Sequence, residues 1–189
     1  MKPMTHQPVS LCVKLATEPF ELEQIYALNH KTFVEEIPRY AAAPNGLLVD
    51  RFDTENTYVI GLRHDRVIGM VAIRGTRPFS LDERLPDLDS YLPPGRSTCE
   101  LRLLAIDRRD RRRRLLPLLL QAVWRHTRSC GYDLAIISGI VQQQKLYSHL
   151  GFEPFGPLIG TPEARFQPMM LTLERFALRA RALFRNIET

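Results

Sequence analysis

The sequence predicts a mixed α/β fold, a central twisted sheet flanked by helices, in one domain that spans residues 1–189. Its 189 residues suit one α/β domain and are few for two. Apolar β-type runs recur along the chain with helical segments between them, which is typical of a sheet covered by helices. The hydrophobic fraction of 44% and the charged fraction of 25% are ordinary for a globular protein, so a core without disulfide bonds is expected.

The first half is expected to hold one helix, a long loop and a hairpin. Residues 11–18 predict a strand that ends before Pro19, where a helix with apolar residues near helical spacing begins. Residues 37–56 contain two prolines, a glycine and scattered charges, and they indicate a long loop of the kind that often binds ligands. Two β-rich runs, 57–63 and 66–74, are joined by a His-Asp pair and predict a hairpin.

The centre of the chain predicts two buried strands with a helix between them. A proline-rich segment leaves room for only a short helix at 81–91, and the apolar run 98–106 follows as a strand buried on both faces. Residues 111–129 predict a helix that begins in arginines and stops at Gly131. The next apolar run, 133–141, predicts the second buried strand.

The last part of the chain predicts a short helix, two strands and a closing helix. The short helix ends at Gly151, strands are expected at 155–159 and 168–174, and residues 175–187 predict a basic amphipathic helix. The apolar face of this last helix is narrow and contains alanine. Packing on the domain, or on a second subunit of a homodimer, is therefore favoured over binding to a membrane surface.

Composition excludes several kinds of site and partner. The three cysteines are far apart and form no CxxC pair, so neither a zinc site nor a disulfide framework is expected; Cys99 is interpreted as a buried apolar residue, with a catalytic thiol as the alternative. No secretory leader or membrane-spanning run is found, so a cytoplasmic location is the default. The net charge of +5 favours a partner that carries negative charge: a phosphate, an acidic protein or nucleic acid. Nucleic acid is not expected, because aromatic residues do not alternate with the arginines.

The segment from Glu100 to Phe152 carries the strongest functional signal. A buried strand ends in Ala-Ile-Asp (105–107), an arginine-rich turn leads into a helix, and a second buried strand and Tyr-Ser-His-Leu-Gly-Phe (147–152) come later. A turn that leads into a helix offers unpaired N–H groups to a pyrophosphate. This arrangement resembles the acyl-CoA site of the GCN5-related N-acetyltransferase (GNAT) superfamily. The resemblance implies a GNAT-like fold and an N-acyltransferase that uses no metal and no prosthetic group.

The resemblance also implies roles for single residues. The backbone of Leu104 and Ile106 would pair with the pantetheine arm of acyl-CoA or of another phosphopantetheine-linked acyl donor, and Tyr147 would protonate the leaving thiolate. The family pattern Q/R-x-x-G-x-G/A is Arg111-x-x-Arg114-x-Leu116 here, so the two small residues that let a backbone approach phosphate closely are absent. The residues placed at the donor phosphates are Arg111, Arg112, Arg113, Arg114, Leu115 and Leu116.

The first half resembles the autoinducer-synthase and N-acyl amino acid synthase branch of the same superfamily. The resemblance implies substrate-binding roles for Phe33, Asp50, Asp53 and Arg74, and it places Glu100 just before the central strand. The segments that carry this likeness are NHKTFVEE (29–36), VDRFDTENTYVIGL (49–62), VAIR (71–74) and CELRLLAID (99–107).

Two further features bear on this branch. The branch has a second arginine three residues after the glutamate, and this position is Leu103 here. Arg102, one position earlier, is the arginine available for substrate binding. Many members take acyl groups from acyl carrier protein, which is acidic. The six arginines within 108–114 suit such a surface as well as they suit CoA phosphates.

Each candidate residue also has a simpler structural interpretation. Asp50 and Asp53 are typical turn and cap residues. Glu100 lies on an apolar strand, where it is either a general base acting on the acceptor amine through water or the ionic partner of Arg74 or Arg102. Tyr147 also suits an apolar core, and the arginine run also suits a solvated helix start.

The sequence therefore predicts an acyltransferase that moves an acyl group from a thioester donor to a small-molecule amine, with amino acids among the candidate acceptors. Glu100 would accept the amine proton, the backbone near Leu104 would polarise the thioester carbonyl, and Tyr147 would protonate the thiolate. One alternative is an ordinary acetyl-CoA-dependent amine N-acetyltransferase. Another is a non-catalytic degenerate GNAT module that docks an acidic partner.

Overall fold

An eight-stranded mixed sheet forms the centre of the computed structural model, which describes residues 11–41, 44–111, 114–162 and 164–184. All neighbouring strands are antiparallel except β4 and β5, which are parallel. The predicted mixed α/β fold is therefore confirmed. The strands lie in the order β1 (Leu11–Leu15), β2 (Asn56–Arg63), β3 (Arg66–Arg74), β4 (Thr98–Ile106), β5 (Leu134–Ile140), β8 (Ala164–Thr172) and β6 (Glu153–Pro154), with β7 (Ile159–Thr161) also paired to β8.

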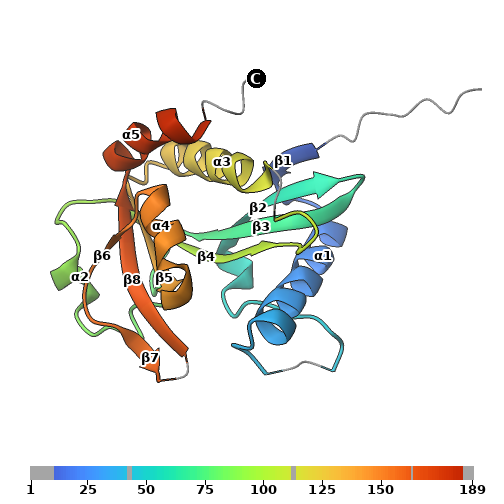
Figure 1. Ribbon diagram of the computed structural model, residues 1–189, viewed down its shortest axis with the longest axis horizontal. Coiled ribbons are helices and arrows are strands. Elements are labelled where there is room, and N and C mark those ends of the chain that lie inside the picture. Colours follow the sequence, from blue (N-terminus) through green and yellow to red (C-terminus); the bar gives the residue numbers. More distant parts are fainter. Residues whose placement is uncertain (1–10, 42–43, 112–113, 163, 185–189) are drawn as a thin grey trace, which may run out of the picture.

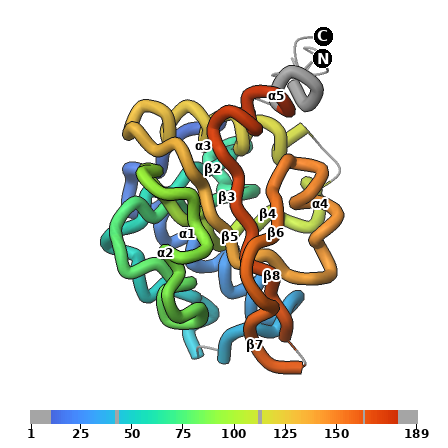
Figure 2. Tube along the Cα trace, turned by 90° about the vertical axis from the view of Figure 1, so that its left-hand side faces the viewer, coloured from blue at the N-terminus to red at the C-terminus, as the bar shows by residue number. Residues whose placement is uncertain are grey.

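Helices cover both faces of this sheet (Figure 1). The N-terminal helix α1 packs on β3 and β4, whereas α3 packs on the opposite face of β1, β2 and β3. Figure 2 shows β8 running from the end of the sheet near α5 down to β7. The helices are α1 (Pro19–His30), the π-helix η1 (Lys31–Glu36), the 3₁₀ turns η2 (Asp53–Glu55) and η3 (Val141–Gln143), α2 (Leu88–Tyr91), α3 (Leu115–Ser129), α4 (Gln144–Leu150) and α5 (Leu173–Phe184).

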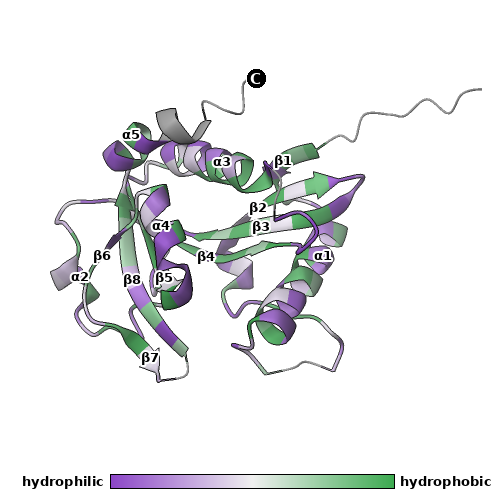
Figure 3. Cartoon of the chain, in the orientation of Figure 1, coloured by the Kyte–Doolittle hydropathy of each residue, from purple (hydrophilic) through white to green (hydrophobic). Residues whose placement is uncertain are grey.

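Alternation along the strands divides the core into an α1 side and an α3 side. Tyr58 and Ile60 on β2 point to α1, while Val59 between them points to α3. Figure 3 shows the resulting apolar runs along the central strands. The β2–β3 hairpin turns at His64 and Asp65, which both have positive φ (48° and 58°), as a two-residue turn of the primed type requires.

Strands β4 and β5 separate beyond a short paired region. Their parallel pairing covers only Thr98 to Glu100 on β4 and Leu134 to Ile136 on β5. Both strands continue, β4 to Ile106 and β5 to Ile140, without pairing to one another. The edge of β4 that faces β5 is thus left without a neighbouring strand, and a gap opens between the two halves of the sheet.

Several predicted boundaries were wrong. The helix expected from 111 begins at Leu115, with Pro117 in its first turn, where a missing N–H costs no helical hydrogen bond. The strand expected at 155–159 is not formed as one unit: β6 ends just before this range, at Pro154, and β7 begins at its last residue, Ile159. The strand expected at 168–174 begins earlier, at Ala164, and residues 173–174 already belong to α5. Helix α1 continues as η1, which holds the aromatic Phe33 expected near its end.

Two facing glycines receive Leu115 from α3. Gly61 and Gly69 are register partners on β2 and β3, and Leu115 is fully buried above them. A Cβ at Gly61 would lie 2.4 Å from Leu115 Cδ1, and one at Gly69 would lie 2.8 Å from Leu115 Cδ2. The position of the first turn of α3 is therefore fixed by a leucine side chain that only glycines on β2 and β3 can accommodate.

We expect Gly61→Ala to lower the free energy of unfolding by about 1–3 kcal/mol, because the added methyl group overpacks this contact. Urea unfolding followed by circular dichroism measures the loss. The double variant Gly61→Ala/Leu115→Ala is the control, since removal of the leucine makes room for the methyl group. A double variant whose loss equals the sum of the two single losses would contradict this account.

Candidate active site

A buried ion pair lies at the point where β4 and β5 begin to separate. The Glu100 carboxylate is fully buried and accepts hydrogen bonds from the N–H (2.8 Å) and the hydroxyl of Ser80. Arg102 lies with Nη1 3.4 Å from Glu100, and its Nη2 donates to Asp50 Oδ1 at 2.9 Å. Burial alone would lower the pKa of Arg102, but the charges of Glu100 and Asp50 raise it. The structure thus pairs Glu100 with Arg102 and not with Arg74.

Asp50 and Asp53 connect this pair to β2 and α1. Asp50 also accepts a hydrogen bond from Asn56 Nδ2 at 2.7 Å, and Asp53 accepts one from each of the Tyr26 and Tyr58 hydroxyls at 2.7 Å. Burial, followed by the bond to Asp53, raises the pKa of Tyr26 to about 12, and burial also raises the pKa of Tyr58. Both phenols therefore stay protonated and donate. Neither aspartate caps η2 through its side chain.

Phe52, which sequence analysis did not single out, supports the arginines of this network. The Arg74 guanidinium lies 3.8 Å from the centre of the Phe52 ring and that of Arg102 lies 4.8 Å from it. Arg74 is only 1% exposed; its Nε donates to the Pro78 carbonyl at 2.7 Å, and its Nη2 lies 3.2 Å from Glu55. Phe52 stands between the two predicted aspartates in the sequence, which is the signal that could have identified it.

The network carries more negative than positive charge. Its four carboxylates face two guanidinium groups, a formal excess of two negative charges. A third guanidinium, that of Arg51, lies 4.4 Å from the centre of the Phe52 ring but pairs with Glu83 at 2.7 Å, so this excess is unchanged. Spare hydrogen-bonding capacity remains in the described part of the chain, because Arg74 Nη1, Arg102 Nε and Asn56 Oδ1 are buried there without a partner. The charged members are Asp50, Asp53, Glu55, Glu100, Arg74 and Arg102.

A bulge in β4 explains how Arg102 takes part although the related branch has its arginine one residue later. Arg102 pairs with Ala72 and Ala105 pairs with Met70, so the two residues between them oppose the single residue Val71. Leu103 adopts φ of 52° there. Arg102 shares the face of Glu100, two residues away, and Leu103 packs into the core on that same α1 side. Both positions therefore present side chains to one face.

The bulge also decides where the backbone of β4 points. The Asp107 N–H donates to the Ile68 carbonyl of β3 at 2.8 Å. Because backbone groups alternate along a strand, Leu104 and Ile106 direct theirs away from β3 and toward the gap left by β5. These are the two residues that the GNAT resemblance assigns to the pantetheine arm. The Ile106 carbonyl already accepts a hydrogen bond from Arg111 Nε at 3.0 Å.

Tyr147 lies on the other face of the sheet from Glu100. Its ring covers Gly139 of β5, where a Cβ would come within 2.9 Å of the ring, and it packs with the core on the α3 side. Burial raises the pKa of Tyr147, and nearby Arg39 opposes this only in part. A protonated phenol and a buried carboxylate thus lie on opposite faces of the sheet, the carboxylate on β4 and the phenol on α4, packed over β5.

The arginine-rich turn is held to η1 by ion pairs. Arg111 pairs with Glu36, and Lys31 Nζ lies 3.3 Å from Asp107. Burial favours the neutral form of Asp107, but the Arg109 N–H and Lys31 hold its pKa below its usual value.

Of the other residues expected at the phosphates, Arg114 is exposed and precedes α3 with φ of −69°. The side chain of Leu115 is core, and that of Leu116 packs against the core on the α3 side. The remaining two, Arg112 and Arg113, lie outside the described residues.

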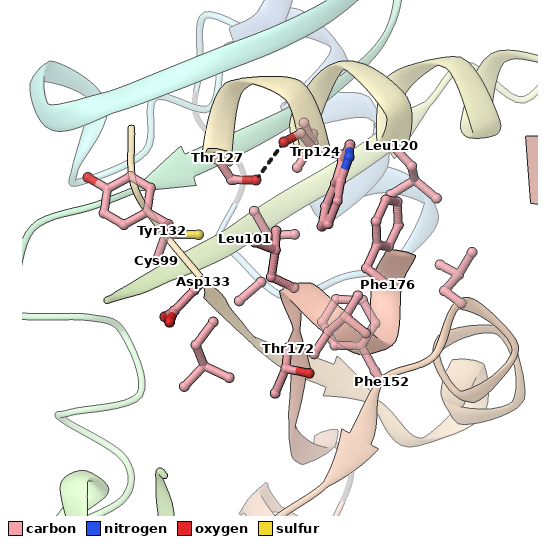
Figure 4. Close-up of a pocket in the computed structure, with 16 residues that line it drawn as sticks. Cys99, Leu101, Leu120, Trp124, Thr127, Tyr132, Asp133, Phe152, Thr172 and Phe176 are labelled. Atoms are coloured by element: carbon pink, nitrogen blue, oxygen red, sulfur yellow. Dashed lines mark hydrogen bonds between the residues drawn. The ribbon is translucent and has the colours of Figure 1, made fainter. Parts of the chain in front are cut away.

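An apolar cavity of about 40 Å³ lies between α3, α5 and the paired ends of β4 and β5 (Figure 4). Cys99 and Leu101 of β4 line it, and the rings of Trp124 and Phe176 pack with their centroids 4.5 Å apart and their planes tilted by 37°. The volume suffices for a few water-sized molecules, so an alkyl chain would enter only if these side chains moved. Burial raises the pKa of Cys99 to about 12, which makes its thiol unsuited to nucleophilic attack.

Two further observations limit the chemistry of the described residues. No three His, Cys, Asp or Glu side chains come together in the described ranges as a metal site would need. No helix within those same ranges has both the length and the apolar character to cross a membrane.

The model of the FeeM N-acyl amino acid synthase family matches residues 24–174. A sequence search of curated proteins gave no match. The CoA-dependent acyl-homoserine lactone synthase BjaI, solved with MTA, superposes with a TM-score of 0.80 at 21% identity, over 95% of this chain and 90% of that one. FeeM, an N-acyl amino acid synthase from uncultured soil microbes, superposes with a TM-score of 0.73 at 16% identity, over 93% of this chain and 98% of that one. An N-acetyltransferase from Staphylococcus aureus Mu50 superposes with a TM-score of 0.64 at 15% identity, over 87% of this chain and 99% of that one. These three structural similarities confirm the GNAT-like fold.

We expect Glu100→Gln to lower the free energy of unfolding by about 3 kcal/mol, because it breaks a buried ion pair with Arg102 and replaces a carboxylate oxygen that Ser80 donates to by an amide nitrogen. Ser80→Ala removes a hydroxyl donor to the same carboxylate but no charge, and we expect it to cost about 1 kcal/mol. Urea denaturation of both variants gives the comparison. A Glu100→Gln loss no larger than that of Ser80→Ala would show that the pair contributes little.

Proposed function

We propose, because this chain belongs to the FeeM family of N-acyl amino acid synthases, that it transfers an acyl group from a phosphopantetheine thioester to the amine of an amino acid. Family membership makes the chain an N-acyltransferase, as its sequence predicted. One observation supports the residue assignment most directly: β4 and β5 separate just beyond Glu100, where the charged network begins. A donor arm in this gap and an acceptor at the network would meet at that point.

In the proposed mechanism the acceptor amine binds at the acidic network. An ammonium group is attracted by the excess of negative charge around Asp50 and Asp53, and it must lose a proton before it can attack. Glu100 would accept that proton, directly or through a water molecule. The pairing of Glu100 with Arg102 at 3.4 Å is long for a charge-assisted hydrogen bond, which is consistent with a carboxylate that can exchange partners.

The thioester would lie in the gap with its carbonyl toward the free edge of β4. An N–H of this edge, at Leu104 or Ile106, would stabilise the oxyanion that develops as the amine attacks. The carbon–sulfur bond then breaks, and Tyr147 would give its proton to the leaving thiolate. The raised pKa of Tyr147 supports this role, because the phenol is still protonated at neutral pH. The acyl chain would extend toward the apolar cavity next to Cys99 and Leu101.

The donor is proposed to be acyl carrier protein in preference to free acyl-CoA. Both motif glycines are replaced by larger residues at the start of α3, which hinders close approach of a pyrophosphate. Arg108, Arg109 and Arg114 are exposed, and no ion pair holds them among the described residues. Such a cationic surface suits an acidic protein.

The first test is thiol release from long-chain acyl carrier protein, long-chain acyl-CoA and acetyl-CoA in the presence of an amino acid mixture, with the product identified by mass. We expect acylated amino acid from the long-chain donors. Glu100→Gln and Tyr147→Phe should each lower kcat by about 100-fold or more, since each removes a proton-transfer group.

The exposed Tyr91→Phe is the matched control and should keep wild-type turnover. Rates are referred to the folded fraction, because Glu100→Gln is expected to be destabilised. Turnover with acetyl-CoA alone would return the chain to ordinary amine acetylation. Full turnover in both proton-transfer variants would contradict the mechanism.

The carrier-protein preference has its own test. Arg108→Glu/Arg109→Glu should lower kcat/KM for the carrier-protein donor by about 10-fold or more at low salt, because it reverses charge at the docking surface. The same variant should change kcat/KM for acyl-CoA by less than about 3-fold. Arg125→Glu, on the exposed side of α3, is the control. Equal losses with both donors would show that these arginines serve the phosphates that both donors share.

A further inference from the structure

Two arginines that the mechanism above does not use face one aromatic ring near the gap. The Arg39 guanidinium, from the segment after η1, lies 4.6 Å from the centre of the Phe166 ring on β8 and 5.8 Å from that of Phe33. The guanidinium of Arg84, from the segment before α2, lies 5.5 Å from the centre of the same Phe166 ring. Arg39 therefore connects the α1 half of the molecule with the β8 half, across the strands that separate.

Neither guanidinium has a carboxylate partner within the part of the chain that the structure describes. This contrasts with Arg74 and Arg102, whose positive charges are more than balanced by the acids around them. Burial lowers the pKa of Arg39, the neighbouring Tyr147 and Tyr40 oppose this shift, and the charge of Arg84 adds to it. Two cations without a carboxylate partner among the described residues, the partly buried Arg39 and the exposed Arg84, thus share one ring and offer a site for an anion.

Strand register places this pair on the same face as the charged network. Glu100 pairs with Ile136, and Ile140, four residues further along β5, pairs with Phe166. Paired and alternate residues share a face, so Glu100 and Phe166 point to the same side of the sheet. Ser138 lies between them on this face, and its hydroxyl is buried with no hydrogen-bond partner among the described residues. Tyr40 interacts electrostatically with both Arg39 and Arg102, which places it close to the two clusters.

We infer that Arg39 and Arg84 bind the carboxylate of the acceptor amino acid, with Ser138 as an additional donor. The inference rests on the proposed function and names the group that selects its acceptor. An α-amino acid carries a cation and an anion, and this face offers an acidic network for the first and a pair of arginines for the second. Guanidinium groups are suited to the second task because they can grip both oxygens of a carboxylate.

The test compares an amino acid with its carboxamide, which keeps the amine and removes the negative charge. Wild type should prefer the amino acid. Arg39→Gln should lower kcat/KM for the amino acid by about 10- to 100-fold and leave kcat/KM for the carboxamide within about 3-fold of wild type. Arg39→Lys should recover part of the preference. Arg125→Gln is the matched control, since Arg125 is an exposed arginine of α3, a helix that packs on β1, β2 and β3.

Equal losses for acid and carboxamide in Arg39→Gln would show that Arg39 only holds Phe33 and Phe166 together, and would overturn the inference. Unchanged kinetics for both would overturn it as well. If wild type acylates no acceptor, the proposed function fails, and calorimetric titration with an N-acyl amino acid and its carboxamide takes over. Tighter binding of the acid that Arg39→Gln abolishes would then support the carboxylate site. Equal binding of the two ligands would overturn it.

Discussion

The separation of β4 from β5 is the constraint on which the rest of the structure depends. A parallel pair that stops after three residues leaves strand edges whose N–H and C=O groups need other partners. On the opposite edge, β4 is held to β3 through the bulge at Leu103 and through the Asp107 N–H bond to Ile68. The turn that follows is fixed by Lys31 at Asp107, and α3 is seated by Leu115 between two glycines. The edge of β4 that faces the gap is thus supported from its β3 side, which the acyl donor would not need to reach.

Charge is distributed along this opening in a way that a folding requirement alone does not explain. A buried ion pair is often no more stabilising than an apolar replacement of the same shape, so stability alone does not account for the network, and the proposed function assigns it to acceptor binding. The acids exceed the arginines around Glu100, while Arg39 and Arg84 lack acids beside Phe166. A ligand that carries both charges would match the two ends, as the proposed carboxylate site requires.

Much of this site could be predicted from the sequence, for reasons that differ between residues. Asp50, Asp53, Arg74 and Glu100 were predicted because a motif spans them, and they do lie in one network. Arg102 could be proposed only as a near match, because a bulge that brings residues 102 and 103 to one face leaves no trace in the order of residues. The strand and helix pattern was predicted where apolar runs were long, as at 66–74 and 98–106, and failed for the short strands β6 and β7.

Other contributors could not be predicted, since long-range packing alone creates their roles. Ser80 reaches Glu100 from a segment without any pattern, and Arg39 gains its significance from a ring 127 positions further along the chain. In the arginine run, by contrast, the sequence suggested a role that the packing of the chain does not display. Arg111 matches a phosphate-binding motif, yet here it pairs with Glu36 at the end of η1. A donor phosphate at Arg111 would share the guanidinium with that carboxylate, and Glu36 stands three residues before Arg39 in the sequence. The proposed donor and acceptor sites would then both contact the segment 36–39, so that binding of a ligand at one site would affect binding at the other.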